Sequence, residues 1–139
     1  MGVTIKMNKE YFKKICKVLS EKSTCNRVKK AAIITRENQI ISTGYSGAPR
    51  KCKHCGDEHI MKNNHCVNTV HAEVNAIVNA AKNGINISDC EMYCSNKHCF
   101  RCMQILINFG IRVVYYFDDY KDEFQKNFEE NKFCEFVKI

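Results

Sequence analysis

Apolar residues recur every three or four positions in four stretches of the chain, which is the spacing of an amphipathic helix. In the first stretch Phe12 and Leu19 fall on one face, and Asn8 precedes them with a side chain suited to capping a helix. The second stretch stops at Asn83 and Gly84, a common helix end. The expected helices cover residues 8–23, 70–82, 98–109 and 118–130, the last capped by Asp118 or Asp119.

Short runs of β-branched and aromatic residues between these helices predict strands. Residues 31–35 and 39–44 flank a turn-like segment and predict a hairpin. Further strands are expected at 91–94, 111–117 and 134–139. Because strands and helices alternate after the hairpin, we expect an α/β fold with a mainly parallel sheet, covered by helices on both faces.

The periodicity disappears between about residues 45 and 69. Gly47, Pro49 and Gly56 interrupt this segment, which has few apolar residues and many Cys and His. Irregular loops of this length are uncommon in compact domains and are usually functional. We therefore expect something other than apolar burial to order it.

Length and composition set broad limits. The 139 residues, 45% hydrophobic and 27% charged, predict a single folded domain over 1–139 rather than a disordered or membrane protein. No apolar run approaches the ~18 residues of a spanning helix, and the first residues lack a signal-peptide pattern, so we expect a cytoplasmic location. The net charge of +7 is compatible with nucleic acid, with nucleotide phosphates or simply with solubility.

Ten Cys and five His are the unusual part of the composition. In a reducing compartment such a count favours metal binding or catalysis over disulfides. Cys16, Cys90, Cys94 and Cys134 lie in helix or strand patterns and are expected to be small buried hydrophobes. Most of the others cluster between residues 52 and 71 or between 98 and 102.

Two short motifs fall at expected helix starts: His71-Ala72-Glu73, and Cys99-Phe100-Arg101-Cys102. A helix start favours the thiolate form of cysteine, which is the form that binds metal. His71, Cys99 and Cys102 together would give three protein ligands and leave one position for water, as catalytic zinc sites do. Glu73 is then placed to act as general acid and base beside that water.

These motifs resemble those of deoxycytidylate (dCMP) deaminases in the cytidine deaminase-like superfamily, in which H-x-E precedes P-C-x-x-C. The resemblance runs from about residue 23 to 120, through the segments STCNR (23–27), ISTGYSGAPR (41–50), HCVNTVHAEVNAI (65–77), AAKNG (80–84), MYCSNKHCFRC (92–102) and GIRVVYY (110–116). It implies a three-layer α/β/α cytidine deaminase-like fold with a five-stranded mixed sheet. It also implies hydrolysis of dCMP to dUMP and ammonia, with Zn²⁺ on His71, Cys99 and Cys102, and dUMP supplying dTMP synthesis.

The resemblance further implies contacts to substrate and effectors. Substrate-binding candidates are Ser46, Ala72, Ser95 and Tyr120, with Ser46 facing the sugar and Tyr120 near the phosphate. Family members often form hexamers that respond to dCTP and dTTP, with Mg²⁺ accompanying the activating triphosphate. Gly47, Arg50 and Lys82 fall in the matching segments.

The chain departs from the family pattern at two positions. His98 replaces the proline that usually precedes the first cysteine, and this proline rigidifies the helix start. Its loss should loosen the site without abolishing it. Ser46 replaces the usual asparagine, and the shorter side chain bears on the sugar contact and the preference for deoxyribose.

Related dCMP deaminases often carry ligands of a second zinc in the Cys/His-rich loop. By that resemblance Cys25, Cys55, His65 and Cys66 would hold a closed structural Zn²⁺, with Cys52, His54, Glu58 or His59 as substitutes for one ligand. A structural zinc can order a polar loop that apolar burial cannot.

Two other function classes are compatible with parts of the sequence. The same chemistry could act on cytosine in another nucleotide or in single-stranded nucleic acid, but the chain has no Trp and no interleaving of aromatic residues with Arg. A non-enzymatic zinc-binding module would explain the Cys and His spacing, but not Glu73 or a site with only three ligands.

Overall fold

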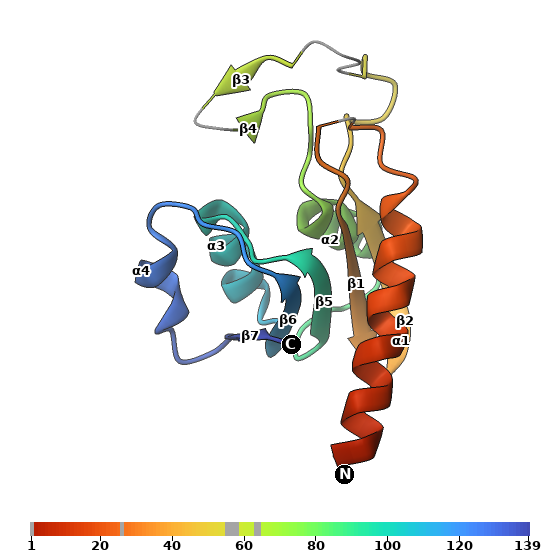
Figure 1. Ribbon diagram of the computed structural model, residues 1–139, viewed down its shortest axis with the longest axis vertical. Helices are drawn as coiled ribbons and strands as arrows, with labels where there is room; N and C mark the ends of the chain where they lie inside the picture. The colour runs from red at the N-terminus through yellow and green to blue at the C-terminus, as the bar shows by residue number, and fades with distance from the viewer. Residues whose placement is uncertain (1, 26, 55–58, 63–64) are drawn as a thin grey trace.

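The computed structural model describes residues 2–25, 27–54, 59–62 and 65–139. Its main sheet has five strands in the order β2-β1-β5-β6-β7 (Figure 1). The strands are β1 (Ala31–Arg36), β2 (Gln39–Tyr45), β5 (Glu91–Asn96), β6 (Val113–Asp118) and β7 (Glu135–Lys138). β1 is antiparallel to both β2 and β5, whereas β5, β6 and β7 run parallel. The expected five-stranded mixed sheet is confirmed: β2, β5, β6 and β7 run in one direction, and only β1 runs against them.

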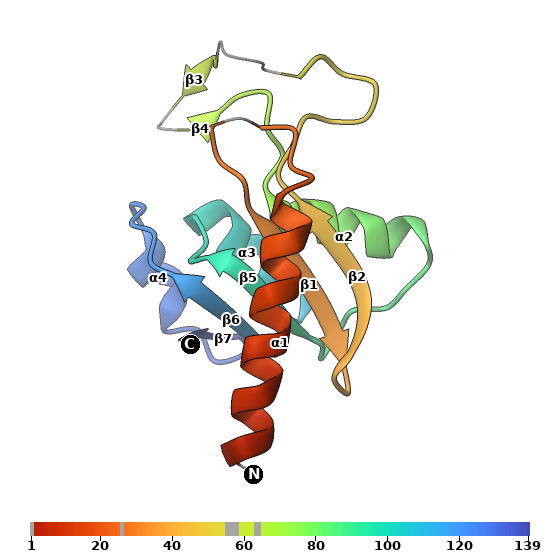
Figure 2. The ribbon, with the colours of Figure 1, turned by 45° about the vertical axis from the view of Figure 1, so that its right-hand side comes forward.

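Helices cover both faces of this sheet, as expected. Alternate residues of β1 point to opposite sides: Ala32 and Ile34 pack with α2 (Ala72–Lys82) and α3 (Phe100–Phe109), while Ile33 packs with α1 (Gly2–Ser20). Figure 2 shows α1 crossing in front of the strands. The predicted burial of Cys16, Cys90, Cys94 and Cys134 is confirmed, since they lie in these two cores.

Two helix boundaries differ from the sequence-based expectation. α1 begins at Gly2, so Asn8 lies inside it rather than capping it, and the Asn8 amide instead donates to Asn38 Oδ1 at 3.4 Å. The last helix, α4, covers only Gln125–Glu129, and neither Asp118 nor Asp119 caps it. Asp118 ends β6, and Asp119 pairs with Lys138 at 2.6 Å. The chain then remains irregular up to Phe124, the N-cap of α4.

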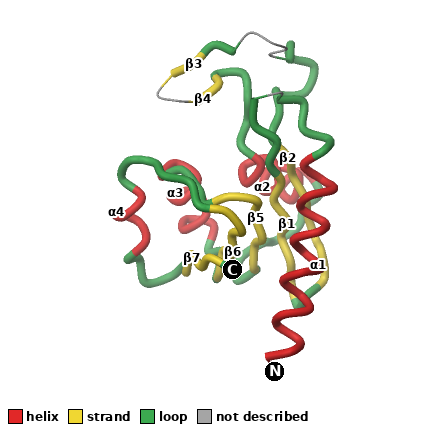
Figure 3. Tube along the Cα trace, in the orientation of Figure 1, coloured by secondary structure: helices red, strands yellow, loops and turns green. Residues whose placement is uncertain are grey.

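The segment between β2 and α2 projects from one end of the sheet, as the tube in Figure 3 makes clear. It contains a short antiparallel pair, β3 (Met61–Lys62) and β4 (His65–Cys66), which sequence patterning did not predict. A bridge between Gly47 and Val70 joins the two ends of this segment, next to the end of β2 and the start of α2. The segment therefore lies over the start of α2, at the end of the sheet where β5 and β6 finish (Figure 1).

Among the described residues, no helix is both long enough and apolar enough to cross a membrane.

Candidate active site

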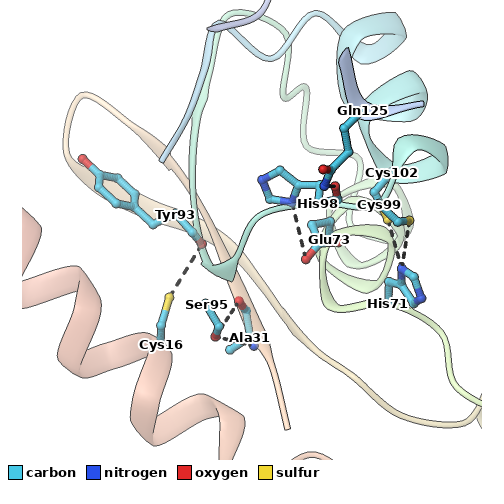
Figure 4. Close-up of polar contacts among 10 residues, drawn as sticks. All are labelled: Cys16, Ala31, His71, Glu73, Tyr93, Ser95, His98, Cys99, Cys102 and Gln125. Carbon is cyan, nitrogen blue, oxygen red and sulfur yellow. Dashed lines mark hydrogen bonds and ion pairs between the residues drawn. The ribbon is translucent and has the colours of Figure 1, made fainter. Parts of the chain in front are cut away.

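The starts of α2 and α3 meet at the carboxyl end of β5. His71 is the N-cap of α2 and Cys99 is the N-cap of α3, both in extended backbone conformation. Neither side chain makes a capping hydrogen bond, so both are available to a ligand. His71 Nδ1 lies 3.3 Å from Cys102 Sγ and 3.4 Å from Cys99 Sγ (Figure 4). The structure thus brings together the three residues of the predicted zinc site.

The donor set suits zinc. With ligand bonds of about 2.0 Å to nitrogen and about 2.3 Å to sulfur, two ligands on a tetrahedral zinc lie about 3.6 Å apart. The nitrogen–sulfur distances of 3.3 and 3.4 Å are within a few tenths of that separation. Cys99 and Cys102 are buried, and His71 is partly buried. A zinc ion could therefore be held here by two sulfurs and one nitrogen, with only small side-chain adjustments.

The local electrostatics prepare one thiol for a metal. A hydrogen bond from the Cys102 thiol lowers the pKa of Cys99, and the His71 imidazole lowers it further against the effect of burial. The same hydrogen bond, together with burial, raises the pKa of Cys102. The hydrogen bond to Cys99 raises the pKa of His71. Before metal arrives, the two sulfurs therefore share a proton, and metal binding must release it.

Glu73 lies in the first turn of α2 and is 6% exposed. Burial raises the pKa of its carboxyl, but the His98 and His71 imidazoles and the Cys102 thiol together outweigh burial, so that the pKa falls to about 2. His98 Nδ1 lies 3.8 Å from Glu73 Oε1, with the ring between Glu73 and the aromatic side chains of Tyr116 and Phe136. Glu73 is thus a buried carboxylate in the ionised, proton-accepting form.

His71 and Cys99 of the triad line one cavity of about 310 Å³ together with Glu73. Four basic side chains also line it: Arg27, Lys30, Lys97 and Lys121. Glu73 is the only carboxylate among the described lining residues. Lys97 is already paired with Glu129, and Lys30 Nζ lies 4.4 Å from the centre of the Tyr120 ring. The cavity therefore brings together two residues of the metal-capable triad, one ionised carboxylate and an excess of positive charge.

The predicted substrate-binding residues do not all reach this cavity. Ala72, Ser46 and Tyr120 line it, whereas Ser95 bonds to the Ala31 backbone between β5 and β1 and is not among the lining residues. Ser46 is 3% exposed, and its hydroxyl donates to Val28 O at 2.9 Å. The Ser46 side chain is therefore engaged within the protein, and its contact to the sugar stays a prediction.

The loop residues of the predicted second site are only partly described, because Cys55 and the substitute Glu58 lie outside the described residues. Cys25 and Cys66 are buried and line the cavity. His59 Nδ1 lies 3.4 Å from Cys66 Sγ, whereas the His65 ring lies against His71, with ring centroids 5.1 Å apart. His59 is thus beside a sulfur of this group and His65 is beside the active-site triad.

The remaining candidate ligands and effector residues are not among the described residues that line the cavity. Cys52 and His54 are exposed in the loop, as is Arg50. Gly47 is buried, and a Cβ there would come within 2.5 Å of Thr24 Oγ1, so packing alone accounts for its lack of a side chain. Lys82 is exposed in the last turn of α2, at the opposite end from His71.

Sequence patterning missed several residues around the site. Two lie near the start of α4: Asp122 accepts from the Phe100 backbone N–H at 3.0 Å, and Gln125, the first residue of α4, donates to His98 O at 2.7 Å. The basic residues of the cavity were also missed, because isolated Lys and Arg look like ordinary surface residues in a sequence. The adjacent parallel strands β5 and β6 offered the one usable signal, since loops at their carboxyl ends must be neighbours.

Fold and site together define a class. A mixed five-stranded sheet, with a His-x-Glu helix start facing a Cys-x-x-Cys helix start, is the arrangement of cytidine deaminase-like proteins. Residues 6–118 match the family described as the cytidine and deoxycytidylate deaminase zinc-binding region, and the chain belongs to this family.

Individual relatives agree with this assignment. ComE operon protein 2 of Bacillus subtilis is 38% identical over 113 residues, which are 81% of this chain and 60% of that protein. Human deoxycytidylate deaminase is 31% identical over 123 residues, covering 81% of this chain and 66% of the human protein. This chain therefore spans less than two thirds of the length of either relative.

Solved structures show the same fold. The dCMP deaminase of cyanophage S-TIM5, in complex with dCMP and dUMP, superposes with a TM-score of 0.81 and 26% identity over 94% of this chain and 96% of the phage chain. A tRNA:A34 deaminase, with 14% identity and a TM-score of 0.65, shares the fold.

Proposed function

We propose that this chain is a zinc-dependent hydrolase that deaminates dCMP to dUMP and ammonia, and so provides dUMP for dTMP synthesis. One observation carries the proposal: the buried Glu73 carboxylate lines the same cavity as His71 and Cys99 of the Cys/Cys/His triad, and four basic side chains line that cavity as well. The kinship with deoxycytidylate deaminases, and the dCMP and dUMP bound by the phage relative, support this choice of substrate.

His71, Cys99 and Cys102 would hold the zinc. Bound there, zinc would lower the pKa of a water molecule and so supply a nucleophile at neutral pH. Because His71 is the N-cap of α2 and Glu73 lies in the first turn of the same helix, a group bound by the three ligands would be close to Glu73.

Glu73 performs the proton transfers. Its ionised carboxylate accepts a proton from the attacking water and delivers it to N3 of the cytosine ring. A C4–O bond forms, and Glu73 then takes the proton of the new C4 hydroxyl and passes it to the amino group, so that the C4–N bond breaks, ammonia leaves and C4 becomes a carbonyl. Because Glu73 is buried, these protons stay between enzyme and substrate.

The basic residues of the cavity fit a nucleotide better than a nucleoside. A 5′-phosphate brings about two negative charges, and Arg27, Lys30, Lys97 and Lys121 all line the cavity. The Lys30 ammonium lies over the face of the Tyr120 ring, so a phosphate that contacts Tyr120, as predicted, would also lie close to Lys30. We propose that this group holds the phosphate, while Ala72 and Ser46 line the nucleoside part of the cavity.

The decisive experiment measures ammonia release with dCMP, CMP, dCTP and cytidine, and with a cytosine-bearing single-stranded oligonucleotide. Wild-type protein should act on dCMP with the highest kcat/KM. Glu73→Gln preserves the size of the side chain and should retain bound zinc, but lose at least about 10²-fold in kcat. Turnover of the oligonucleotide alone would assign the chain to polynucleotide deamination, and the absence of any turnover with zinc bound would leave a zinc-binding module.

We also propose a second, structural Zn²⁺ in the Cys/His-rich loop, held by Cys25, Cys66 and His59, with Cys55 as the predicted fourth ligand. The 3.4 Å separation of His59 Nδ1 and Cys66 Sγ favours His59 over His65. Metal analysis should give two zinc ions per chain in the wild type and one in His59→Ala. One zinc ion in both proteins would contradict this second site.

Allosteric control and assembly follow from family resemblance only. We propose a hexamer whose rate responds to dCTP, with Mg²⁺, and to dTTP, through the segments of Gly47, Arg50 and Lys82. The rate of dCMP turnover with and without each triphosphate tests the control, and the mass of the protein in solution tests the assembly.

A further inference from the structure

The turn that leads into Cys99 lacks the proline that zinc deaminases usually carry before the first cysteine. Proline would fix one backbone dihedral angle just before the metal-ligating turn. With His98 in its place, the backbone at 98–100 has more freedom in the unliganded chain. Something else must hold the sulfur of Cys99 in position if the site is to bind metal well.

The structure shows contacts that can do this, all from the segment between β6 and the start of α4. Asp122 Oδ2 accepts a hydrogen bond from Phe100 N–H at 3.0 Å. Gln125 Nε2 donates to His98 O at 2.7 Å (Figure 4). The residues just before and just after Cys99 are thus both held by side chains from one short segment.

The segment also contacts the first residue of α3 through Phe124. Phe124, the N-cap of α4, has a φ of 65°, which a bulky residue rarely adopts unless neighbouring contacts enforce it. Its ring packs edge-on against Phe100, with centroids 5.4 Å apart. Gln125 follows directly and is 8% exposed, so its amide points inward to the turn rather than to solvent.

The same amide reaches the substrate side of the cavity. Gln125 Nε2 also donates to Tyr120 O at 2.9 Å, and Tyr120 lines the cavity next to Lys121. One buried side chain therefore connects the backbone that presents Cys99 with the backbone that presents Tyr120.

We propose that Asp122 and Gln125 are positioning residues for the zinc-binding turn, and that they supply the rigidity which proline gives elsewhere in the family. This inference rests on the proposed zinc site. Groups that orient metal ligands without touching the metal typically change its affinity by about 10- to 100-fold when removed. A proline introduced at position 98 should make the two side chains largely redundant.

Position 98 can accept that test. Among the described residues, no hydrogen bond uses the His98 N–H, so proline would remove none. Lys97 N–H donates to Asp118 O at 2.9 Å and continues the β5–β6 ladder, which is the extended conformation that a residue before proline prefers.

The experiment measures how fast the zinc-loaded protein releases zinc to an excess of a colorimetric chelator under native conditions. Gln125→Met keeps the length of the side chain but removes the amide, and should release zinc about 10- to 100-fold faster than wild type. Asp122→Ala should behave similarly, and Asp122→Asn, which retains an acceptor oxygen, should stay close to wild type. Glu123→Ala is the matched control, because Glu123 is an exposed acidic neighbour, and it should not change the rate.

The double variant gives the sharpest readout. If Gln125→Met accelerates release about 10-fold or more in the wild type but less than about threefold in His98→Pro, the proposal holds. Equal acceleration in both backgrounds, or none in either, overturns it. If Gln125→Met does not fold, the comparison of Asp122→Ala in the two backgrounds decides in the same way. A wild type that binds no zinc at this triad would instead refute the proposed function itself.

Discussion

Gly44 on β2 lies directly against the backbone of α2. A Cβ at position 44 would come within 2.3 Å of Ala76 N and 2.5 Å of Ala72 O, both backbone atoms of α2. No rotation of a side chain can relieve such contacts. Gly44→Ala must therefore push the start of α2 away from β2 by roughly 1 Å, the shortfall from an ordinary van der Waals contact.

The magnitude follows from what that shift disturbs. Overpacking in a tight core typically costs about 1–3 kcal/mol. The shift also weakens two side-chain hydrogen bonds between α2 and β2, Ser42 Oγ to Ala76 O at 2.7 Å and Asn79 Nδ2 to Thr43 O at 2.8 Å, each contributing about 1 kcal/mol. We expect Gly44→Ala to lower the free energy of unfolding by about 3 kcal/mol or more.

Urea unfolding at fixed pH measures this change. With a slope of about 2 kcal/mol per molar urea, the midpoint should fall by about 1.5 M. Gly84→Ala is the comparison, because that position has open space but a φ of +67°, so only the backbone penalty of about 1 kcal/mol remains. Because α2 carries His71 and Glu73, Gly44→Ala should also reduce kcat by about 10²-fold where it folds. A loss of stability no larger than that of Gly84→Ala would refute the reasoning.

Two further predictions concern pH and substrate charge. Burial raises the pKa of the Cys16 thiol to about 12, against about 9 for an exposed thiol, so this thiol contributes stability that is complete below pH 9 and is lost as the pH rises toward 12. Between pH 8 and pH 10.5, the free energy of unfolding measured in urea should therefore fall by about 2 kcal/mol less in Cys16→Ala than in wild type. An equal fall in both proteins would show that the buried Cys16 thiol does not cause this pH dependence. Lys121→Ala should raise KM for dCMP about 10-fold but leave KM for deoxycytidine, which has no phosphate, almost unchanged. A similar rise in KM for both substrates would show that Lys121 does not bind the phosphate.

The sequence predicted best those elements whose local pattern and final environment agree. The run at 111–117 became β6 because its apolar residues are buried between helices on both faces. The direction of β1 relative to β5 was not predictable, because antiparallel and parallel neighbours bury the same alternating residues. The helix expected at 118–130 shrank to α4 because the backbone of Phe124 adopts a left-handed conformation, which a continuous right-handed helix cannot contain and no local pattern indicates.

The candidate site divides in a similar way. His71, Glu73 and the two cysteines were found because their chemistry requires particular residue types at short, fixed spacing. Asp122 and Gln125 could not be found, because an acid and an amide in a polar stretch are ordinary surface residues until the segment docks on α3. The spacing of residues in the sequence therefore identified the candidate metal ligands and Glu73. The residues that orient them are defined only by how separate segments pack against one another in the fold.

The wide separation of the metal ligands along the chain has a consequence for folding kinetics. His71 lies 28 and 31 residues from Cys99 and Cys102, and the β1–β5 contact beside them joins residues 64 apart. Contacts between distant residues close late, because the entropy of ordering the intervening chain must be lost first. The triad is therefore absent from the unfolded chain and forms only once the sheet centre has assembled. Zinc should leave the folding rate nearly unchanged and act mainly by slowing unfolding, unlike zinc in a small finger whose ligands are neighbours in sequence.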